Sequence, residues 1–166
     1  MSKGFQLYYP DKSFHLFDRM VEQNQHFYYI QTTQAETLAQ RLATYQEYTG
    51  RVTYQWHDES GLRRYDIPHI VIPRTQNLLN AISHISQNNH FGIHLFTGFG
   101  DALQKPMALN VLDAYLNTHH NDRKILIFAD PNPSIPREMN GAFQELRDGS
   151  IMDNSPPPLQ PLKAIY

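Results

Sequence analysis

Acidic side chains and one histidine follow three strand-like runs of this sequence. They are His57, Asp58, Glu59, Asp101 and Asp130. Parallel strands end at one edge of a sheet, so Asp58, Asp101 and Asp130 could converge there on a divalent cation. Such a site would support phosphoryl-transfer or nuclease chemistry. A second version of the metal site would use His57, Asp58, Glu59 and Asp130. Acidic residues are also common in solvated loops, so we keep the metal-dependent enzyme as an alternative.

Motifs of other enzyme classes are missing. After the first strand-like run, Gln31-Thr32-Thr33 stands where a phosphate-binding loop would need GxxxxGK[ST]. Residues 98–100 provide only GxG, and no GxSxG surrounds a serine. Thr97 and Gly98 stand where a hydrolytic ATPase would carry acidic residues. We therefore expect no catalytic residue and no cofactor, and we lean against an enzyme.

Two arginines lie close to aromatic residues in the middle of the chain. Arg63 and Arg64, flanked by Trp56 and Tyr65, could contact phosphates while the rings stack on bases. Weak nucleic-acid binding is therefore a third hypothesis. The net charge of −2 argues against a polyphosphate as the main partner.

Aromatic side chains are also candidates for a protein interface, because they are enriched at binding hot spots. Those singled out are Tyr8, Tyr9, Phe99, Tyr115 and Tyr166, beside Trp56. Self-association is one form that such binding could take. It would use an edge strand such as residues 69–72, which prolines bracket on both sides.

The elements that must position these residues alternate along the chain. Strands are predicted at residues 26–30, 51–56, 91–96 and 124–129, with 69–72 as an edge strand or a linker and 57–67 as a polar loop. Helices lie between the strands, and right-handed crossovers place them on both faces of a parallel sheet. The predicted fold class is α/β, with three α/β/α layers around a mainly parallel sheet of four to five strands.

Local signals predict several helix ends. Thr33 and Glu36 fit a capping box, and Thr75 can cap the following helix. Gly50 suits the position after a helix, and Pro106 suits a first turn. A last helix is predicted from Pro136, with inward side chains Met139, Phe143 and Leu146.

Composition is that of an ordinary globular protein. The chain has 166 residues, of which 40% are hydrophobic and 18% charged. This length suits one domain, predicted at residues 1–149, before a Pro-rich tail at 150–166. No run approaches the roughly 20 apolar residues of a membrane span. There is no cysteine and no signal peptide, so we expect a cytoplasmic protein without a membrane partner.

Three segments together resemble a known family. They read FYYIQTTQAETLAQRLATYQ, then RVTYQWHDESGLRR, then the stretch from HLFTGFGD to IPRE. Over roughly residues 26–140 this order is similar to the P-loop-less N-terminal domain of a bacterial and plastid group of AAA-type ATPases. The resemblance implies a stand-alone, degenerate P-loop NTPase-like domain without nucleotide hydrolysis, and it transfers no catalytic residue. A non-catalytic protein-interaction or regulatory domain is therefore our leading hypothesis.

Overall fold

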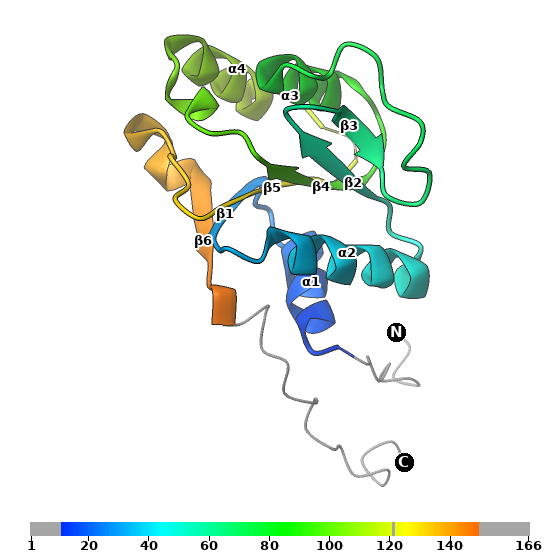
Figure 1. The fold of residues 1–166 in the computed structure, drawn as a ribbon. Helices are drawn as coiled ribbons and strands as arrows, with labels where there is room; N and C mark the ends of the chain where they lie inside the picture. Colours follow the sequence, from blue (N-terminus) through cyan, green and yellow to red (C-terminus); the bar gives the residue numbers. More distant parts are fainter. Residues whose placement is uncertain (1–10, 121, 150–166) are drawn as a thin grey trace, which may run out of the picture.

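Six β-strands of the computed structural model form one sheet (Figure 1). They are β1 (Phe27–Gln31), β2 (Thr53–His57), β3 (Gly61–Arg64), β4 (Gly92–Thr97), β5 (Lys124–Asp130) and β6 (Phe143–Leu146). Their order is β3-β2-β4-β5-β1-β6, and every neighbouring pair except β2 and β3 is parallel. The five parallel strands therefore end at the same edge of the sheet. The structure describes residues 11–120 and 122–149.

Helices cover both faces of the sheet (Figure 1). The α-helices are α1 (Ser13–Glu22), α2 (Ala35–Thr49), α3 (Leu78–Gln87) and α4 (Pro106–Asn117). Short 3-10 helices, Ala102–Gln104 and Arg137–Ala142, follow β4 and precede β6. The pair α1 and α2 packs on one face and the pair α3 and α4 on the other, each over its own apolar core. This arrangement confirms the predicted α/β fold with three layers and a mainly parallel sheet.

The two central strands carry the apolar runs that predicted them. All six residues of β4 are buried, and so are the first six of β5. Alternate side chains enter opposite cores: Ile125 and Ile127 pack toward α1 and α2, whereas Leu126 and Phe128 pack toward α3 and α4. A strand covered on both faces needs apolar residues on both.

Two predicted helix ends are confirmed, and one predicted cap is not formed. Gly50 follows α2 with a left-handed φ of 74°, and Pro106 is the first residue of α4. The helix α2 begins at Ala35 without a side-chain cap, so Thr33 and Glu36 do not form the capping box. Thr32 closes the preceding turn instead, because its Oγ1 accepts the N–H of Gln34 at 2.9 Å.

The cap of α3 comes from a different residue than predicted. Asn77, not Thr75, precedes the helix, and its side chain accepts two backbone N–H groups of the first turn. Thr75 is buried, where its Oγ1 accepts the N–H of Leu62 at 2.9 Å and donates to the carbonyl of Ile72 at 2.6 Å. Its hydroxyl therefore fixes the loop beside β3.

The predicted last helix is wrong, because its residues form a 3-10 helix and then β6. Phe143 and Leu146, three apart, fit one face of a helix. On a strand the same spacing sends them to opposite faces. Phe143 lies in the core under α3 and α4, and Leu146 lies in the core under α1 and α2.

The predicted polar loop at 57–67 contains the edge strand β3. With β3 and β6 added to the four strands predicted at the right places, the sheet has six strands instead of four to five. Leu62 is the buried side chain that holds β3 to the core, and the strand is otherwise polar because it lies at an edge. Residues 69–72 do not extend the sheet as a full strand. Val71 forms a single antiparallel bridge with Arg63. The predicted tail and the N-terminal aromatic residues Tyr8 and Tyr9 lie outside the described residues.

Candidate functional site

The loops after β2 and β4 contact each other at the carboxyl edge of the sheet. His57 Nδ1 lies 2.9 Å from Oδ1 of Asp58. A Cβ atom added to Gly98 would lie 2.8 Å from His57 Nε2 and 3.3 Å from the same Asp58 oxygen. Gly98 also has a φ of 67°, a conformation that other residues rarely adopt. Glycine therefore allows this close approach.

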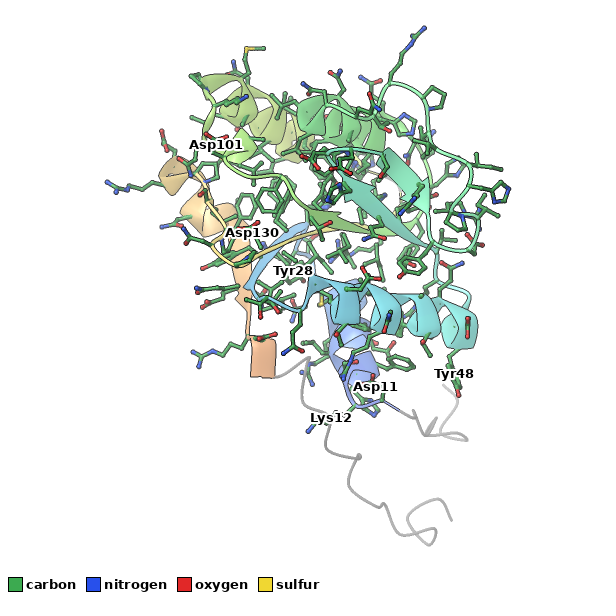
Figure 2. The ribbon with its side chains drawn as sticks, viewed as in Figure 1. Asp11, Lys12, Tyr28, Tyr48, Asp101 and Asp130 are labelled. Carbon is green, nitrogen blue, oxygen red and sulfur yellow. The ribbon has the colours of Figure 1, made fainter. Side chains whose placement is uncertain are left out.

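Asp101 lies beyond the end of β4, and Asp130 is the last residue of β5. Figure 2 labels both on the side of the molecule where the chain leaves β4 and β5. Asp101 is exposed and precedes the 3-10 helix. Oδ2 of Asp130 accepts the backbone N–H of Asn132 at 2.8 Å. Asp130 thus has the turn-forming role that Asp before Pro often has.

These acidic residues do not assemble into a metal site. Within residues 11–120 and 122–149, no group of three or more His, Asp or Glu side chains could hold a metal ion. That statement covers the set Asp58, Asp101 and Asp130. It also covers the set His57, Asp58, Glu59 and Asp130. The carboxyl edge therefore holds one His–Asp pair and separate carboxylates.

The junction between β1 and α2 has no room to wrap a phosphate. Only residues 32–34 separate Gln31, which ends β1, from Ala35, which begins α2. Thr32 is buried, and its N–H donates to the carbonyl of Asp130 at 2.9 Å. A phosphate-binding loop needs free backbone N–H groups on a longer glycine-containing turn. This junction is instead a tight connection hydrogen-bonded to the end of β5.

The three aromatic interface candidates that lie among the described residues are part of the core. Trp56, Phe99 and Tyr115 are each no more than 4% exposed. The ring of Phe99 packs edge-on against Phe128, with centroids 5.6 Å apart. Trp56 Nε1 donates to the carbonyl of Thr75 at 2.6 Å. These three side chains stabilise the fold and are not accessible to a binding partner.

The two arginines on β3 differ in their surroundings. Arg64 forms a bidentate pair with Asp66, with N–O distances of 3.0 and 2.8 Å. This pair raises the pKa of Arg64 and lowers that of Asp66 through the hydrogen bonds between them. Arg63 is half-buried on the strand that bridges to Val71. Trp56 is buried, so its ring cannot stack on bases beside Arg63 and Arg64 as predicted.

Buried cationic and imidazole groups lie toward the start of β5, away from the carboxyl edge. Lys124 Nζ donates to the carbonyl oxygens of Ser86 and Asn88 at the end of α3. Burial lowers the pKa of Lys124, and burial likewise lowers the pKa of His94 to about 3. His94 Nδ1 lies 3.1 Å from the carbonyl of Ile125. Both side chains have backbone partners, so their role is to join elements of the fold.

A polar hollow beside α3 was not predicted from the sequence. Its volume is about 620 Å³, and it is lined by Pro73, Arg74, Asn80, Ser83, His84 and Gln87. The last four lie at i, i+3, i+4 and i+7, which places them on one face of the helix. That polar stripe was the available signal. In the sequence, this polar stripe is typical of an ordinary solvated helix face. Only the structure shows that the turn at residues 73–74 lies opposite it.

No described helix has the length and apolar character needed to cross a membrane. A family model described as SpoVK-like AAA ATPase, N-terminal domain, matches residues 14–146. No curated protein and no solved structure matches the chain. The match begins in α1 and ends with the last residue of β6. It therefore covers the whole three-layer domain, and the chain belongs to the family of N-terminal domains of SpoVK-like AAA ATPases.

Proposed function

We propose that this domain is a non-catalytic protein-interaction or regulatory domain of an AAA-type ATPase system. The observation that carries the proposal is the junction between β1 and α2. Three residues connect the strand to the helix, and Thr32 is bonded to Asp130 where a nucleotide-binding domain would wrap a phosphate. The fold then serves as a scaffold whose surface binds other proteins, including further copies of itself. The absence of cysteine is compatible with the cytoplasmic location that belongs to this proposal.

The metal-dependent alternative receives no support from the described residues. Phosphoryl transfer on a divalent cation needs carboxylates gathered within one coordination sphere. Asp58 is paired with His57, and Asp130 accepts a hydrogen bond from its own loop. Nucleic-acid binding is similarly unsupported, because Trp56 is buried and Arg64 is paired with Asp66.

Nucleotide titration tests the non-catalytic part of the proposal. A nucleotide present at about 100 times its Kd would raise the free energy of unfolding by about 2.7 kcal/mol. For a domain of this size that corresponds to a rise in Tm of roughly 5 °C or more. We expect no such rise with ATP, GTP or their magnesium complexes. A reproducible rise with one of them, together with product formation, would overturn the proposal.

Crosslinking tests the interaction part. The full-length protein is crosslinked in its native cell, its neighbours are identified by mass spectrometry, and binding is then reconstituted from purified components. We expect at least one neighbour, or a second copy of the chain, to bind the purified domain directly. Light scattering at several concentrations detects self-association. If no neighbour binds and the domain is monomeric throughout, the interaction function is wrong.

A further inference from the structure

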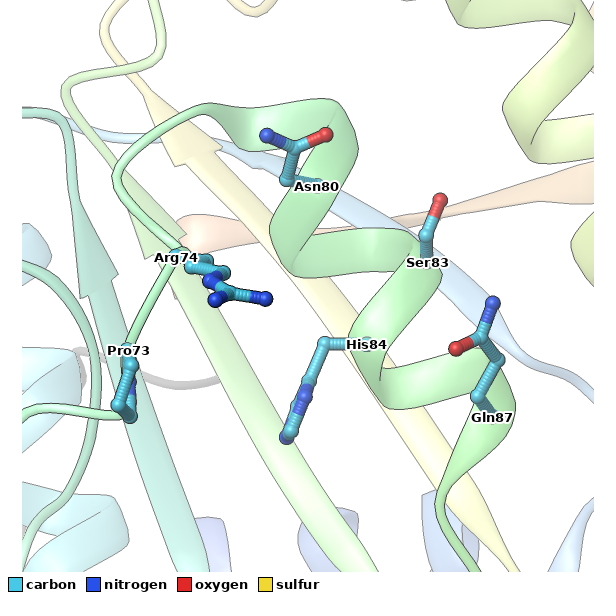
Figure 3. A pocket seen from close by; sticks show the side chains of 6 residues that line it. All are labelled: Pro73, Arg74, Asn80, Ser83, His84 and Gln87. Atoms are coloured by element: carbon cyan, nitrogen blue, oxygen red, sulfur yellow. The ribbon is translucent and has the colours of Figure 1, made fainter.

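The hollow beside α3 is rich in groups that can donate hydrogen bonds and contains no acidic residue. Figure 3 shows Arg74 extending its guanidinium across the hollow toward α3, from which Asn80, Ser83, His84 and Gln87 project. Pro73 lies beside Arg74 on the opposite side from the helix. The amides, hydroxyl and imidazole can each donate a hydrogen bond, and the guanidinium has donors only, so the lining can bind an anionic or carbonyl-rich ligand.

Arg74 has an unusual backbone conformation for its residue type. Its φ is 64°, and it is the one non-glycine residue with a positive φ among those described. Glycine or asparagine would adopt this conformation at lower cost. Backbone strain in a folded protein is a reason to look for a function of the residue that carries it. At this position the strained residue supplies the hollow with a permanent positive charge.

The turn that carries Arg74 is fixed on both sides. Before it, the carbonyl of Ile72 accepts the hydroxyl of Thr75, and the N–H of Ile72 donates to Leu62 of β3 at 2.8 Å. After it, the carbonyl of Thr75 accepts the indole N–H of Trp56. The anchors come from the buried core, so the backbone of Arg74 is preorganised. A preorganised backbone lowers the part of the entropic cost of binding that comes from the main chain.

Neither Arg74 nor His84 forms a salt bridge within the part of the chain that the structure describes. The salt bridges between two described residues are Arg41–Asp11, Arg51–Asp18, His57–Asp58 and Arg64–Asp66. Arg74 and His84 take part in none of them. Four of the six lining residues, including Arg74, are exposed, so a partner can reach them.

The shape of the hollow fits a chain segment better than a single ion. Asn80 and Gln87 are seven residues apart on α3, which is about 10 Å along the helix axis. An extended polypeptide covers that distance with about three residues. Ile70 and Val71, 53% and 39% exposed, lie on the segment that leads to Arg74 and add apolar surface.

We propose that this hollow binds an acidic, extended segment of a protein partner, with a carboxylate paired to Arg74 and apolar side chains near Ile70 and Val71. This inference rests on the proposed interaction function and names its site and ligand chemistry. The helix α3 supplies hydrogen-bond donors to the segment's backbone carbonyls. Arg74 supplies the charge that selects an acidic residue.

The test uses two synthetic peptides that differ only in charge. One alternates glutamate and leucine, and the other alternates glutamine and leucine. Each is titrated into the full chain, labelled with ¹⁵N, while amide chemical shifts are recorded. We expect the glutamate peptide to shift the amides of residues 74–87, the glutamine peptide to shift them far less, and the effect to weaken with added salt.

Two variants separate the site from the surface charge in general. Arg74→Asn removes the guanidinium while suiting the positive φ, and we expect it to weaken binding about tenfold or more without lowering Tm. Arg137→Asn removes an exposed charge from the 3-10 helix before β6 and should leave binding unchanged. Equal loss in both variants would overturn the assignment.

Other outcomes would overturn the proposal in distinguishable ways. If inorganic phosphate or magnesium-ATP shifts the amides of residues 74–87 as strongly as the peptide does, the hollow is an ion or nucleotide site. If the glutamate peptide shifts other residues or none, the hollow is not a peptide site. If a reconstituted partner binds wild type and Arg74→Asn equally, the interaction function stands and this site for it is wrong.

Discussion

The indole Nε1 of Trp56 donates a hydrogen bond to the carbonyl oxygen of Thr75 at 2.6 Å, across 19 residues of sequence. Thr75 also connects the chain in two other directions, because its hydroxyl bonds with Leu62 of β3 and with Ile72. One buried threonine therefore joins the edge of the sheet, the turn at Arg74 and the approach to α3. The stability of this region, from β3 through the turn at Arg74 to the start of α3, depends on hydrogen bonds more than on regular secondary structure.

Replacing Thr75 with valine tests that dependence. Valine keeps the volume but leaves the N–H of Leu62 and the carbonyl of Ile72 without this partner, which should lower the free energy of unfolding by about 2 kcal/mol. Urea denaturation measures the change. Thr118→Val is the matched control, because the Thr118 hydroxyl donates to Ala114 on an exposed helix end. We expect the control to change stability by less than about 0.5 kcal/mol, and equal losses would contradict the role of Thr75.

For a substitution at Arg74 we expect the free energy of unfolding to change in the opposite direction. Substituting asparagine removes the strain of a left-handed arginine, so the free energy of unfolding should increase by about 0.5–1 kcal/mol. Arg74→Lys keeps a long side chain on the same backbone and should show no gain. Thermal and urea denaturation of both variants provide the measurement. A loss of stability in Arg74→Asn would mean that the guanidinium contributes to folding and is not strained for binding.

The fold could be predicted from the sequence where a pattern is local. The largely apolar runs of β4 and β5, the left-handed Gly50 and the first-turn Pro106 each depend on neighbours in sequence. Phe143 and Leu146 could not be resolved in the same way. Their spacing of three residues fits one face of a helix. It also fits a strand, but only where both faces of the sheet are covered by helices, because the two side chains then point to opposite cores.

The candidate sites were harder to predict, because tertiary cover decides them. Trp56 and Phe99 are aromatic residues next to loops, a pattern that suits an interface equally well. The helices above the sheet bury both. The hollow could be predicted only in part. The polar stripe from Asn80 to Gln87 is visible in the sequence. The position of Arg74 opposite that stripe is not, because it depends on the tertiary contacts of Thr75 with Trp56 and Leu62.

Two buried tyrosines make a matched pair for another prediction. The hydroxyl of Tyr115 is buried and has no hydrogen-bond partner among the described residues, whereas that of Tyr28 donates to Gln23 at 2.9 Å. Tyr115→Phe should therefore leave the free energy of unfolding unchanged or raise it by up to about 1 kcal/mol, since an unsatisfied polar group is removed. Tyr28→Phe should lower it by about 1 kcal/mol. Urea denaturation of the two variants side by side distinguishes them, and a reversed order would be inconsistent with these contacts.

His94 predicts how stability depends on pH. Its ring is buried beside Tyr54, with centroids 4.8 Å apart, and Gly92 leaves room for it, since a Cβ there would lie 2.6 Å from the imidazole. Burial holds the pKa of His94 at about 3, against 6.5 for an ordinary histidine. The unfolded chain therefore takes up a proton below pH 6.5 that the folded protein refuses until about pH 3. Between these values the free energy of unfolding should fall by up to about 1.4 kcal/mol for each pH unit of acidification.

The variant His94→Asn isolates this contribution. Asparagine offers an amide nitrogen to the carbonyl of Ile125 but does not titrate, so the pH slope below 6.5 should decrease by about one proton. Its stability at neutral pH falls because the stacked ring is lost, which makes the slope the informative quantity. His90 is exposed, and His90→Asn should leave the slope unchanged. Urea denaturation between pH 4 and 7 provides the slopes, and parallel curves for wild type and His94→Asn would show that the buried imidazole does not control the acid sensitivity of this domain.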